Sequence, residues 1–180
     1  MRITKVTTKK GDKGKTSLGT NEFVSKSSID IQVLGDLDEL SSVLGLVIVL
    51  YRGKELKSKI KDIQNDIFNL GGEISIGTEC KDLLKVNRIR NLEEEIQLIN
   101  KKLPPLREFI LPGGNEISAR IHHARAVCRR AERSLVMMME TKKYKDIWIK
   151  YLNRLSDYLF VLARLMGIDK DSPEDTWKRT

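Results

Sequence analysis

The spacing of apolar residues constrains this chain more than any other feature. From Asp36 onward, apolar side chains recur at steps of three and four in five stretches, over residues 37–51, 56–70, 89–103, 117–138 and 151–165. Residues three and four apart lie on one face of an α-helix, so each stretch predicts an amphipathic helix. Because the connections between them are short, we predict an all-α fold in which five helices form an antiparallel bundle.

The predicted helices belong to a single domain of the ferritin-like, up-and-down type. Residues 1–35 are rich in Gly, Thr, Ser and Lys without a sustained apolar period, and we interpret them as a loop arm. We expect the bundle over residues 36–167, with a loop from Gly71 to Asp82 and a third helix that Pro104 and Pro105 end. The tail, residues 168–180, has little apolar content, so we expect it to be flexible.

The positive charge of the chain is unevenly distributed. Lys and Arg number 33 against 25 Asp and Glu, a net charge of +8, and the excess lies in residues 1–30 and 114–164. If these segments meet, they form an anion site suited to polyphosphate or nucleic acid. The alternative is a solvated basic surface.

Two absences bear on where the protein works. No apolar stretch approaches the roughly 20 residues of a membrane span, so we expect no membrane partner. Cys80 and Cys128 are far apart and belong to no CxxC motif, which favours a reducing, cytoplasmic compartment.

The arm contains a candidate phosphate-binding loop, TKKGDKGKT, from Thr8 to Thr16. Glycines and lysines in this density suit a loop that surrounds phosphates with backbone N–H groups. It is not a Walker loop, because the position five residues before Gly14 holds Lys9 rather than glycine. The alternative is a flexible basic arm.

The fourth predicted helix carries a second candidate site. His122, Arg125, Arg129 and Arg133 follow steps of three and four and therefore share one face. Stacked like charges repel unless an anion lies against them, or unless carboxylates of other helices pair with them. The available carboxylates are those of Asp36, Asp38, Glu39 and Asp157.

Two histidines and one asparagine are further polar candidates on the last two predicted helices. His122 and His123 are adjacent and point about 100° apart on a helix, so they cannot chelate one metal ion together, and we predict no metal site made by the protein. On the fifth predicted helix, Asn153 can donate and accept hydrogen bonds, which suits a purine edge or a ribose as well as a helix contact.

Five blocks, in this order, resemble one known family: TKKGDKGKTSL, GDLDELSS, FILPGG, ARIHHARAVCRRAER and NRLSDYLFVLAR. They are similar to the PduO-type ATP:cob(I)alamin adenosyltransferases, over Thr8 to about Gly167. The resemblance implies a homotrimeric five-helix bundle that binds MgATP between subunits. It also implies that the cobalt of a reduced corrinoid attacks the 5′ carbon of ATP, which releases triphosphate and yields adenosylcobalamin. An electron-donating reductase and an adenosylcobalamin-dependent enzyme are the protein partners it implies.

The resemblance also implies roles for individual residues. Arm residues bind ATP, Lys26 adds a basic contact, and residues of the last two helices complete the nucleotide pocket. Arg125 pairs with Asp38 across the subunit interface, and Phe109 keeps the lower face of the cobalt free of an axial ligand. The implied catalytic residues are Phe109, Arg125, Asp38 and Arg129. The implied nucleotide-binding residues are Thr8, Lys9, Gly11, Asp12, Gly14, Thr16, Lys26, Arg129, Glu132, Arg133 and Asn153.

Some features leave other interpretations open. Asp30 stands where many family members have arginine, and Ser41 where asparagine is common. Composition alone would place Phe109 in the core.

A nucleic-acid-binding protein could use the same arginine face, although no aromatic residue interrupts it as in single-strand readers. A corrinoid carrier is a further alternative, and it would not need ATP.

Overall fold

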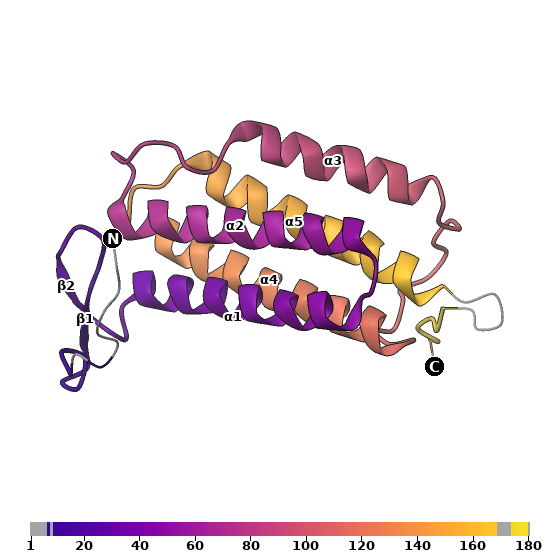
Figure 1. The fold of residues 1–180 in the computed structure, drawn as a ribbon, viewed down its shortest axis with the longest axis horizontal. Helices are drawn as coiled ribbons and strands as arrows, with labels where there is room; N and C mark the ends of the chain where they lie inside the picture. The colour runs from indigo at the N-terminus through magenta and orange to yellow at the C-terminus, as the bar shows by residue number, and fades with distance from the viewer. Residues whose placement is uncertain (1–6, 8, 169–173, 180) are drawn as a thin grey trace.

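The computed structural model of the chain describes residues 7, 9–168 and 174–179. Within these residues, five helices follow a small β-hairpin, as Figure 1 shows. The elements in chain order are β1 (Lys15–Ser17), β2 (Phe23–Ser25), α1 (Ile29–Leu50), α2 (Lys54–Ile76), α3 (Val86–Asn100), α4 (Glu116–Met139) and α5 (Asp146–Gly167).

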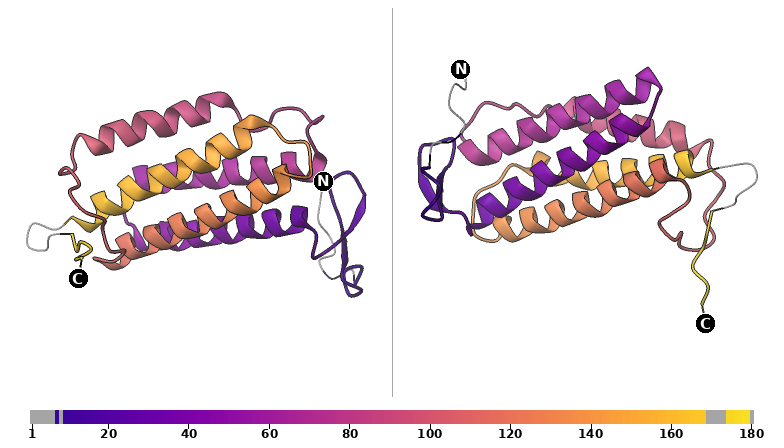
Figure 2. Two further views of the ribbon diagram at one scale, coloured as in Figure 1. Left: turned by 180° about the vertical axis from the view of Figure 1, so that it is seen from behind. Right: turned by 60° about the horizontal axis from the view of Figure 1, so that its bottom comes forward.

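The helices form an elongated bundle, and the prediction of an all-α, five-helix fold is confirmed. Helix α1 packs against α2 and α4, α4 packs against α5, and α5 packs against α3. The views from behind and from below show the same arrangement, with the hairpin at one end and the C-terminus at the other (Figure 2). No helix in the described part of the chain is long and apolar enough to cross a membrane.

The arm differs from the predicted loop in two ways. Strands β1 and β2 pair antiparallel, with Thr16 opposite Val24. Helix α1 begins at Ile29 instead of Asp36, so the expected boundary after residue 35 is wrong. The reason is that Ile29 and Val33 extend the apolar stripe of α1 by two further steps of four, and Val33 is completely buried.

Helix α2 continues through Gly71 and Gly72, which we had expected to begin a loop. Gly71 packs against α1, since a Cβ atom there would make an ordinary contact of 3.5 Å with Leu34. That packing outweighs the cost of a glycine within a helix, about 1 kcal/mol. The helix ends at Gly77, whose φ of +97° favours glycine.

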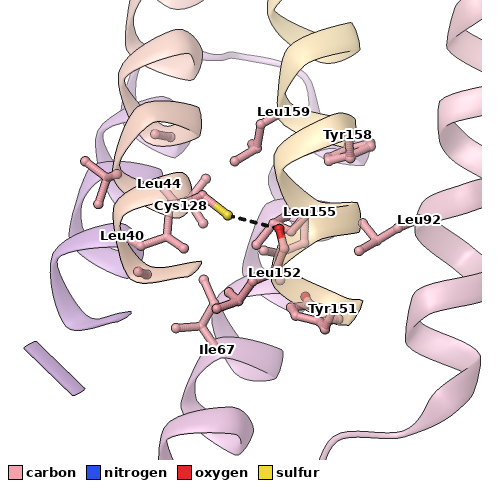
Figure 3. Packing of buried hydrophobic residues seen from close by; sticks show 14 of the residues in the cluster. Leu40, Leu44, Ile67, Leu92, Cys128, Tyr151, Leu152, Leu155, Tyr158 and Leu159 are labelled. Atoms are coloured by element: carbon pink, nitrogen blue, oxygen red, sulfur yellow. Dashed lines mark hydrogen bonds between the residues drawn. The ribbon is translucent and has the colours of Figure 1, made fainter. Parts of the chain in front are cut away.

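The core fills the space between the helices with aliphatic side chains from all five (Figure 3). Leu40 and Leu44 of α1 face Cys128 of α4, and the Cys128 thiol donates a weak hydrogen bond to Leu152 O of α5 at 3.4 Å. Burial raises the pKa of the Cys128 thiol, so it stays protonated. Cys128 is therefore an inert packing residue.

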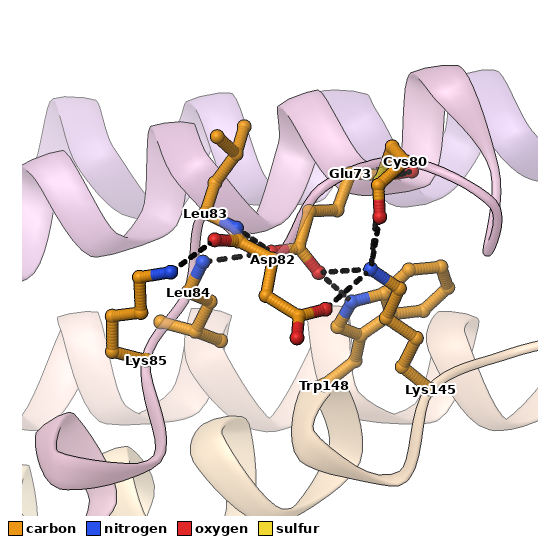
Figure 4. Close-up of polar contacts among 8 residues, drawn as sticks. All are labelled: Glu73, Cys80, Asp82, Leu83, Leu84, Lys85, Lys145 and Trp148. Atoms are coloured by element: carbon orange, nitrogen blue, oxygen red, sulfur yellow. Dashed lines mark hydrogen bonds and ion pairs between the residues drawn. The ribbon is translucent and has the colours of Figure 1, made fainter.

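A buried carboxylate joins three segments at the hairpin end of the bundle (Figure 4). Glu73 of α2 accepts hydrogen bonds from the N–H groups of Leu83 and Leu84, at 2.5 and 2.7 Å. Its second oxygen accepts one from Trp148 Nε1 of α5 at 2.7 Å, with Lys145 Nζ 3.5 Å away. Glu73 thus fixes the α2–α3 connection against the start of α5.

The described part of the tail packs against the connection between α3 and α4, contrary to the expectation of a flexible tail. Leu111 N–H donates to Asp175 O at 2.8 Å, and Trp177 N–H donates to Phe109 O at 2.7 Å. Backbone hydrogen bonds therefore replace the apolar packing that the tail lacks. Residues 169–173 lie outside the described residues.

Candidate functional site

The register of α4 separates a core face from an exposed basic face. Ala124, Cys128 and Ala131 are completely buried against the neighbouring helices. Arg129 and Arg133 lie on the opposite side and are exposed, whereas Arg125 is half-buried at the boundary. The basic face predicted from the sequence therefore exists, but its members differ in exposure.

One arginine of α4 has an ordinary structural role. Arg130 Nε donates to Asp36 Oδ1 of α1 at 3.2 Å, and the same guanidinium pairs with Glu39. Asp36 is 3% exposed and also accepts a hydrogen bond from Ser134 Oγ at 2.6 Å. For Arg130, pairing with carboxylates of another helix is thus the correct interpretation.

Arg125 and Arg133 have no such partner among the residues that the structure describes. The Nε atom of Arg125 is buried without a hydrogen-bond partner, and its guanidinium carbon lies 5.8 Å from the centre of the Phe160 ring. Burial, and then the charge of Arg129, lower the pKa of Arg125. A half-buried cation with an unsatisfied donor is costly, so this face needs an anion from elsewhere.

Four of the predicted nucleotide-binding residues lie together on α4 and α5. Glu132 is the centre of this cluster: its Oε1 accepts from Asn153 Nδ2 at 3.1 Å, and its Oε2 lies 3.9 Å from Arg129 Nη1. Arg133 Nη1 donates to the carbonyl oxygen of Arg129 at 3.1 Å. We call these four residues the α4–α5 cluster; it offers two guanidinium groups, an amide and a carboxylate to a ligand.

The arm brings a second set of predicted residues together. Lys26 N–H donates to Gly14 O at 2.8 Å, and a Cβ atom on Gly11 would lie 2.9 Å from Lys26 Nζ. Lys26 therefore lies over the turn from Lys9 to Gly14, as a further basic contact for this loop requires. Gly14 has a φ of +72°, which favours glycine. Thr8 lies outside the described residues.

The remaining arm residues are available to a ligand. Asp12 is exposed in the turn, and Thr16 is half-buried in β1. Within the described part of the chain, no hydrogen bond or ion pair joins the arm to the α4–α5 cluster. One chain therefore contains both halves of the predicted nucleotide site without bringing them into contact.

Phe109 and Asp38 are also separate from these two sets. Phe109 lies in the connection before α4, at the end of the bundle opposite the hairpin (Figure 1), and is 75% exposed. The interpretation of Phe109 as a core residue is thus wrong. Asp38 is exposed on α1, beside a groove between α1 and α2, and forms no ion pair with Arg125 or any other residue that the structure describes.

The two departures from the family pattern lie at buried positions. Asp30 is 5% exposed and pairs with Lys142 Nζ at 2.6 Å, which links the first turn of α1 to the α4–α5 connection. Ser41 is buried, and its carbonyl oxygen accepts a hydrogen bond from Gln64 Nε2 at 2.8 Å. Both residues therefore contribute to packing between elements.

Sequence reasoning missed a groove of about 610 Å³ between α3 and α5. Its apolar lining includes Ile96, Leu106 and Phe160, and its charged lining includes Arg154 and Arg164. Leu106 belongs to the same α3–α4 connection as Phe109. The residue that could have indicated this groove is Phe160, an aromatic residue next to the apolar stripe of α5.

Comparison with known proteins agrees with this arrangement. The family model for cobalamin adenosyltransferase matches residues 6–166. A cobalamin adenosyltransferase from Cupriavidus metallidurans is 41% identical over 179 residues, which cover 99% of this chain and 96% of that protein. A corrinoid adenosyltransferase from Bacillus subtilis is 38% identical over 168 residues, which cover 91% and 86%.

A solved structure is similar over the same length. It is a variant of the PduO-type ATP:corrinoid adenosyltransferase from Lactobacillus reuteri, complexed with cobalamin and ATP. The TM-score is 0.92 at 29% identity, and the match covers 97% of this chain and 100% of that one. The fold and the basic cluster thus define a helical-bundle, nucleotide-dependent transferase. The chain belongs to the cobalamin adenosyltransferase family.

Proposed function

We propose that this protein transfers the 5′-deoxyadenosyl group of ATP to the cobalt of reduced cobalamin. The observation that carries the proposal is the basic face of α4. Neither Arg125 nor Arg133 pairs with a carboxylate in the described part of the chain, and Arg133 belongs to the α4–α5 cluster with Arg129. Such a face suits a ligand with several negative charges, as the triphosphate of ATP has.

Negative charge develops on the triphosphate as it leaves. The electron pair of cobalt(I) forms a bond to C5′ of the ribose, the C5′–O5′ bond breaks, and triphosphate leaves with that bonding pair. Arg129 and Arg133, with backbone N–H groups and lysines of the arm, stabilise the developing negative charge. Mg²⁺ bound with ATP would be held mainly by the phosphates and by water, and Glu132 would be the carboxylate that the α4–α5 cluster offers it.

We propose that the catalytic site is shared between subunits of a homotrimer. Among the residues that the structure describes, no hydrogen bond or ion pair joins the arm to the α4–α5 cluster, and Asp38 and Arg125 each have no ion-pair partner. Both facts have one explanation if the arm and Asp38 of one subunit meet α4 of the next. Three equivalent clefts would result.

The corrinoid is proposed to bind near Phe109 and the groove between α3 and α5. An exposed aromatic ring, and a groove whose lining includes the apolar side chains of Ile96, Leu106 and Phe160, suit the flat, largely apolar corrin. Phe109 would occupy the lower face of the cobalt and exclude an axial ligand. A four-coordinate cobalt(II) is easier to reduce, because the added electron enters an orbital of lower energy.

We propose that the protein works in the cytoplasm with two protein partners. Cys80 and Cys128 are both free, which fits a reducing cytoplasm. A reductase would deliver the electron to cobalt(II), and an adenosylcobalamin-dependent enzyme would receive the product.

The direct test is an anaerobic assay with MgATP and chemically reduced cobalamin, followed by absorbance for adenosylcobalamin and by triphosphate release. Arg129→Gln should lower the rate by about 10²–10³-fold, the usual effect of removing a donor at developing charge. Arg120→Gln is the matched control, since Arg120 lies on the same helix and pairs with Glu116, one turn earlier. No product from the folded wild-type protein would refute the proposal, and ATP-independent corrinoid binding would favour a carrier.

A further inference from the structure

A short extended pair of segments joins the C-terminal tail to the loop that carries Phe109. Residues Ile110 and Thr176 form an antiparallel bridge between them. It is flanked by the hydrogen bonds from Leu111 N–H to Asp175 O and from Trp177 N–H to Phe109 O, at 2.8 and 2.7 Å. Figure 2 shows the tail running beside this loop at the end of the bundle. We call residues 174–177 the strap.

One buried ion pair attaches the strap to the bundle. Arg164, in the last turn of α5, is 4% exposed, and its Nε and Nη2 atoms donate to the two carboxylate oxygens of Glu174, both at 2.9 Å. Nη2 also donates to Pro104 O at 2.9 Å. A guanidinium buried to this extent requires a carboxylate, and bidentate pairing fixes both position and direction.

Among the described residues, the strap supplies the backbone and aromatic contacts of Phe109 that bear on its position. Its side chain is 75% exposed, and its aromatic neighbour is Trp177 of the strap, with ring centres 6.4 Å apart. Its carbonyl oxygen accepts the hydrogen bond from Trp177 N–H. The direction of the Phe109 ring therefore depends on the strap, and the strap depends on Glu174.

We propose that Arg164 and Glu174 are positioning residues that hold Phe109 in place through the strap. This inference rests on the proposed function, in which Phe109 occupies the lower face of the cobalt. Without the ion pair, the strap and the Phe109 backbone should separate more often. The corrinoid step should then suffer, whereas the α4–α5 cluster, which shares no hydrogen bond with the strap, should still bind ATP.

The test compares Glu174→Gln with Asp175→Asn. Both remove one negative charge from the strap, but the Asp175 side chain is exposed and forms no hydrogen bond or ion pair among the described residues. In Glu174→Gln, the amides of Leu111 and Trp177 should exchange with solvent about tenfold faster, the change expected from losing a charged hydrogen bond. The melting temperature should also fall, because the buried Arg164 guanidinium loses its charged partner. Asp175→Asn should leave both amides unchanged.

Kinetics then separate a positioning role from a purely structural one. Glu174→Gln should raise the KM for the corrinoid and slow the reaction from cobalt(II) with a reductant, with the KM for ATP unchanged. If Glu174 acts through Phe109, adding Glu174→Gln to Phe109→Ala should lower the rate from cobalt(II) little further. If the two residues act independently, the two fold-reductions in rate should multiply.

Each outcome decides a different claim. Unchanged amide exchange in Glu174→Gln would overturn the ion pair as the attachment of the strap. Faster exchange with wild-type corrinoid kinetics would overturn the positioning role. If the wild-type protein makes no adenosylcobalamin, the proposed function and this role fail together, while the exchange experiment still shows whether the ion pair attaches the strap.

Discussion

At the scale of single residues, the exposure of Phe109 separates two roles that its sequence position left open. Truncating a buried phenylalanine costs about 3–5 kcal/mol, but Phe109 is 75% exposed. Phe109→Ala should therefore change the free energy of unfolding little. It should sharply slow adenosylation from cobalt(II) with a reductant, and slow the reaction from pre-reduced cobalt(I) much less. Leu98→Ala, 53% exposed on α3, is the control. Equal losses with both substrates would contradict the role at the cobalt face.

A second residue-scale prediction concerns the two adjacent histidines. Burial, and then the charge of Arg125, lower the pKa of His122 from its ordinary 6.5, while the charge of Glu174 opposes the shift. The unfolded chain then binds a proton at a higher pH than the folded one, so stability falls as the pH drops below 6.5 and levels off below the folded pKa. The largest slope for one group is about 1.4 kcal/mol per pH unit.

The variants His122→Gln and His123→Gln check this prediction in urea unfolding between pH 7.5 and 5, a range chosen around the ordinary histidine pKa. In His122→Gln, the free energy of unfolding should fall less steeply as the pH drops than it does in the wild type. His123 is exposed, so His123→Gln should keep the wild-type slope. Identical slopes in all three proteins would mean that His122 is protonated as easily in the fold as in the unfolded chain.

At the scale of elements, Glu73 holds α2, the α2–α3 connection and α5 together. It is completely buried and accepts three N–H groups. In Glu73→Gln, the side-chain NH₂ group would face at least one of these donors, and Lys145 would lose a charged partner. We expect the free energy of unfolding, measured in urea, to fall by about 1.5–3 kcal/mol. Glu79→Gln, an exposed change in the same connection, should stay within about 0.5 kcal/mol. Equal effects would show that Glu73 is not the joint between these elements.

The same scale shows how far the sequence predicts the fold. Helices α4 and α5 were predicted well because no glycine or proline interrupts their apolar stripes. The start of α1 was missed because Ile29 and Val33 continue its apolar stripe within a segment that is otherwise rich in Gly, Thr, Ser and Lys. The end of α2 was missed because Gly71 and Gly72 are locally poor helix residues that tertiary packing supports. The strap could not be predicted, because its hydrogen bonds join segments far apart in the chain.

The candidate site was predictable to a similar degree. The residues of the α4–α5 cluster follow from helical spacing and from the family motifs. The sequence could not show that Arg130 is neutralised by Asp36 while Arg125 keeps an unsatisfied Nε, because both facts depend on which faces of α1 and α4 meet.

At the scale of the whole molecule, Asp38 and Arg125 test the proposed interface. If they pair between subunits, Asp38→Ala and Arg125→Ala should be coupled by about 0.5–3 kcal/mol in a double-mutant cycle on trimer stability. Asp62→Ala is the control, since Asp62 is exposed on α2 and should combine additively with Arg125→Ala. Additive effects in both cycles, or a monomer by light scattering, would argue against this interface.

The strongest evidence for a shared site would come from mixing two inactive proteins. Lys26→Glu places a negative charge on the arm, and Arg129→Gln removes a cation from the α4–α5 cluster; neither homotrimer should be active. In mixed trimers, some clefts receive an intact arm from one subunit and an intact α4 from the next. With equal amounts and random assembly, up to about a quarter of the clefts should recover. A site contained within one chain would recover nothing, because each chain would then carry one of the two defects in its own site. Recovery measured as adenosylcobalamin formed per trimer therefore decides whether the arm and the α4–α5 cluster act between chains.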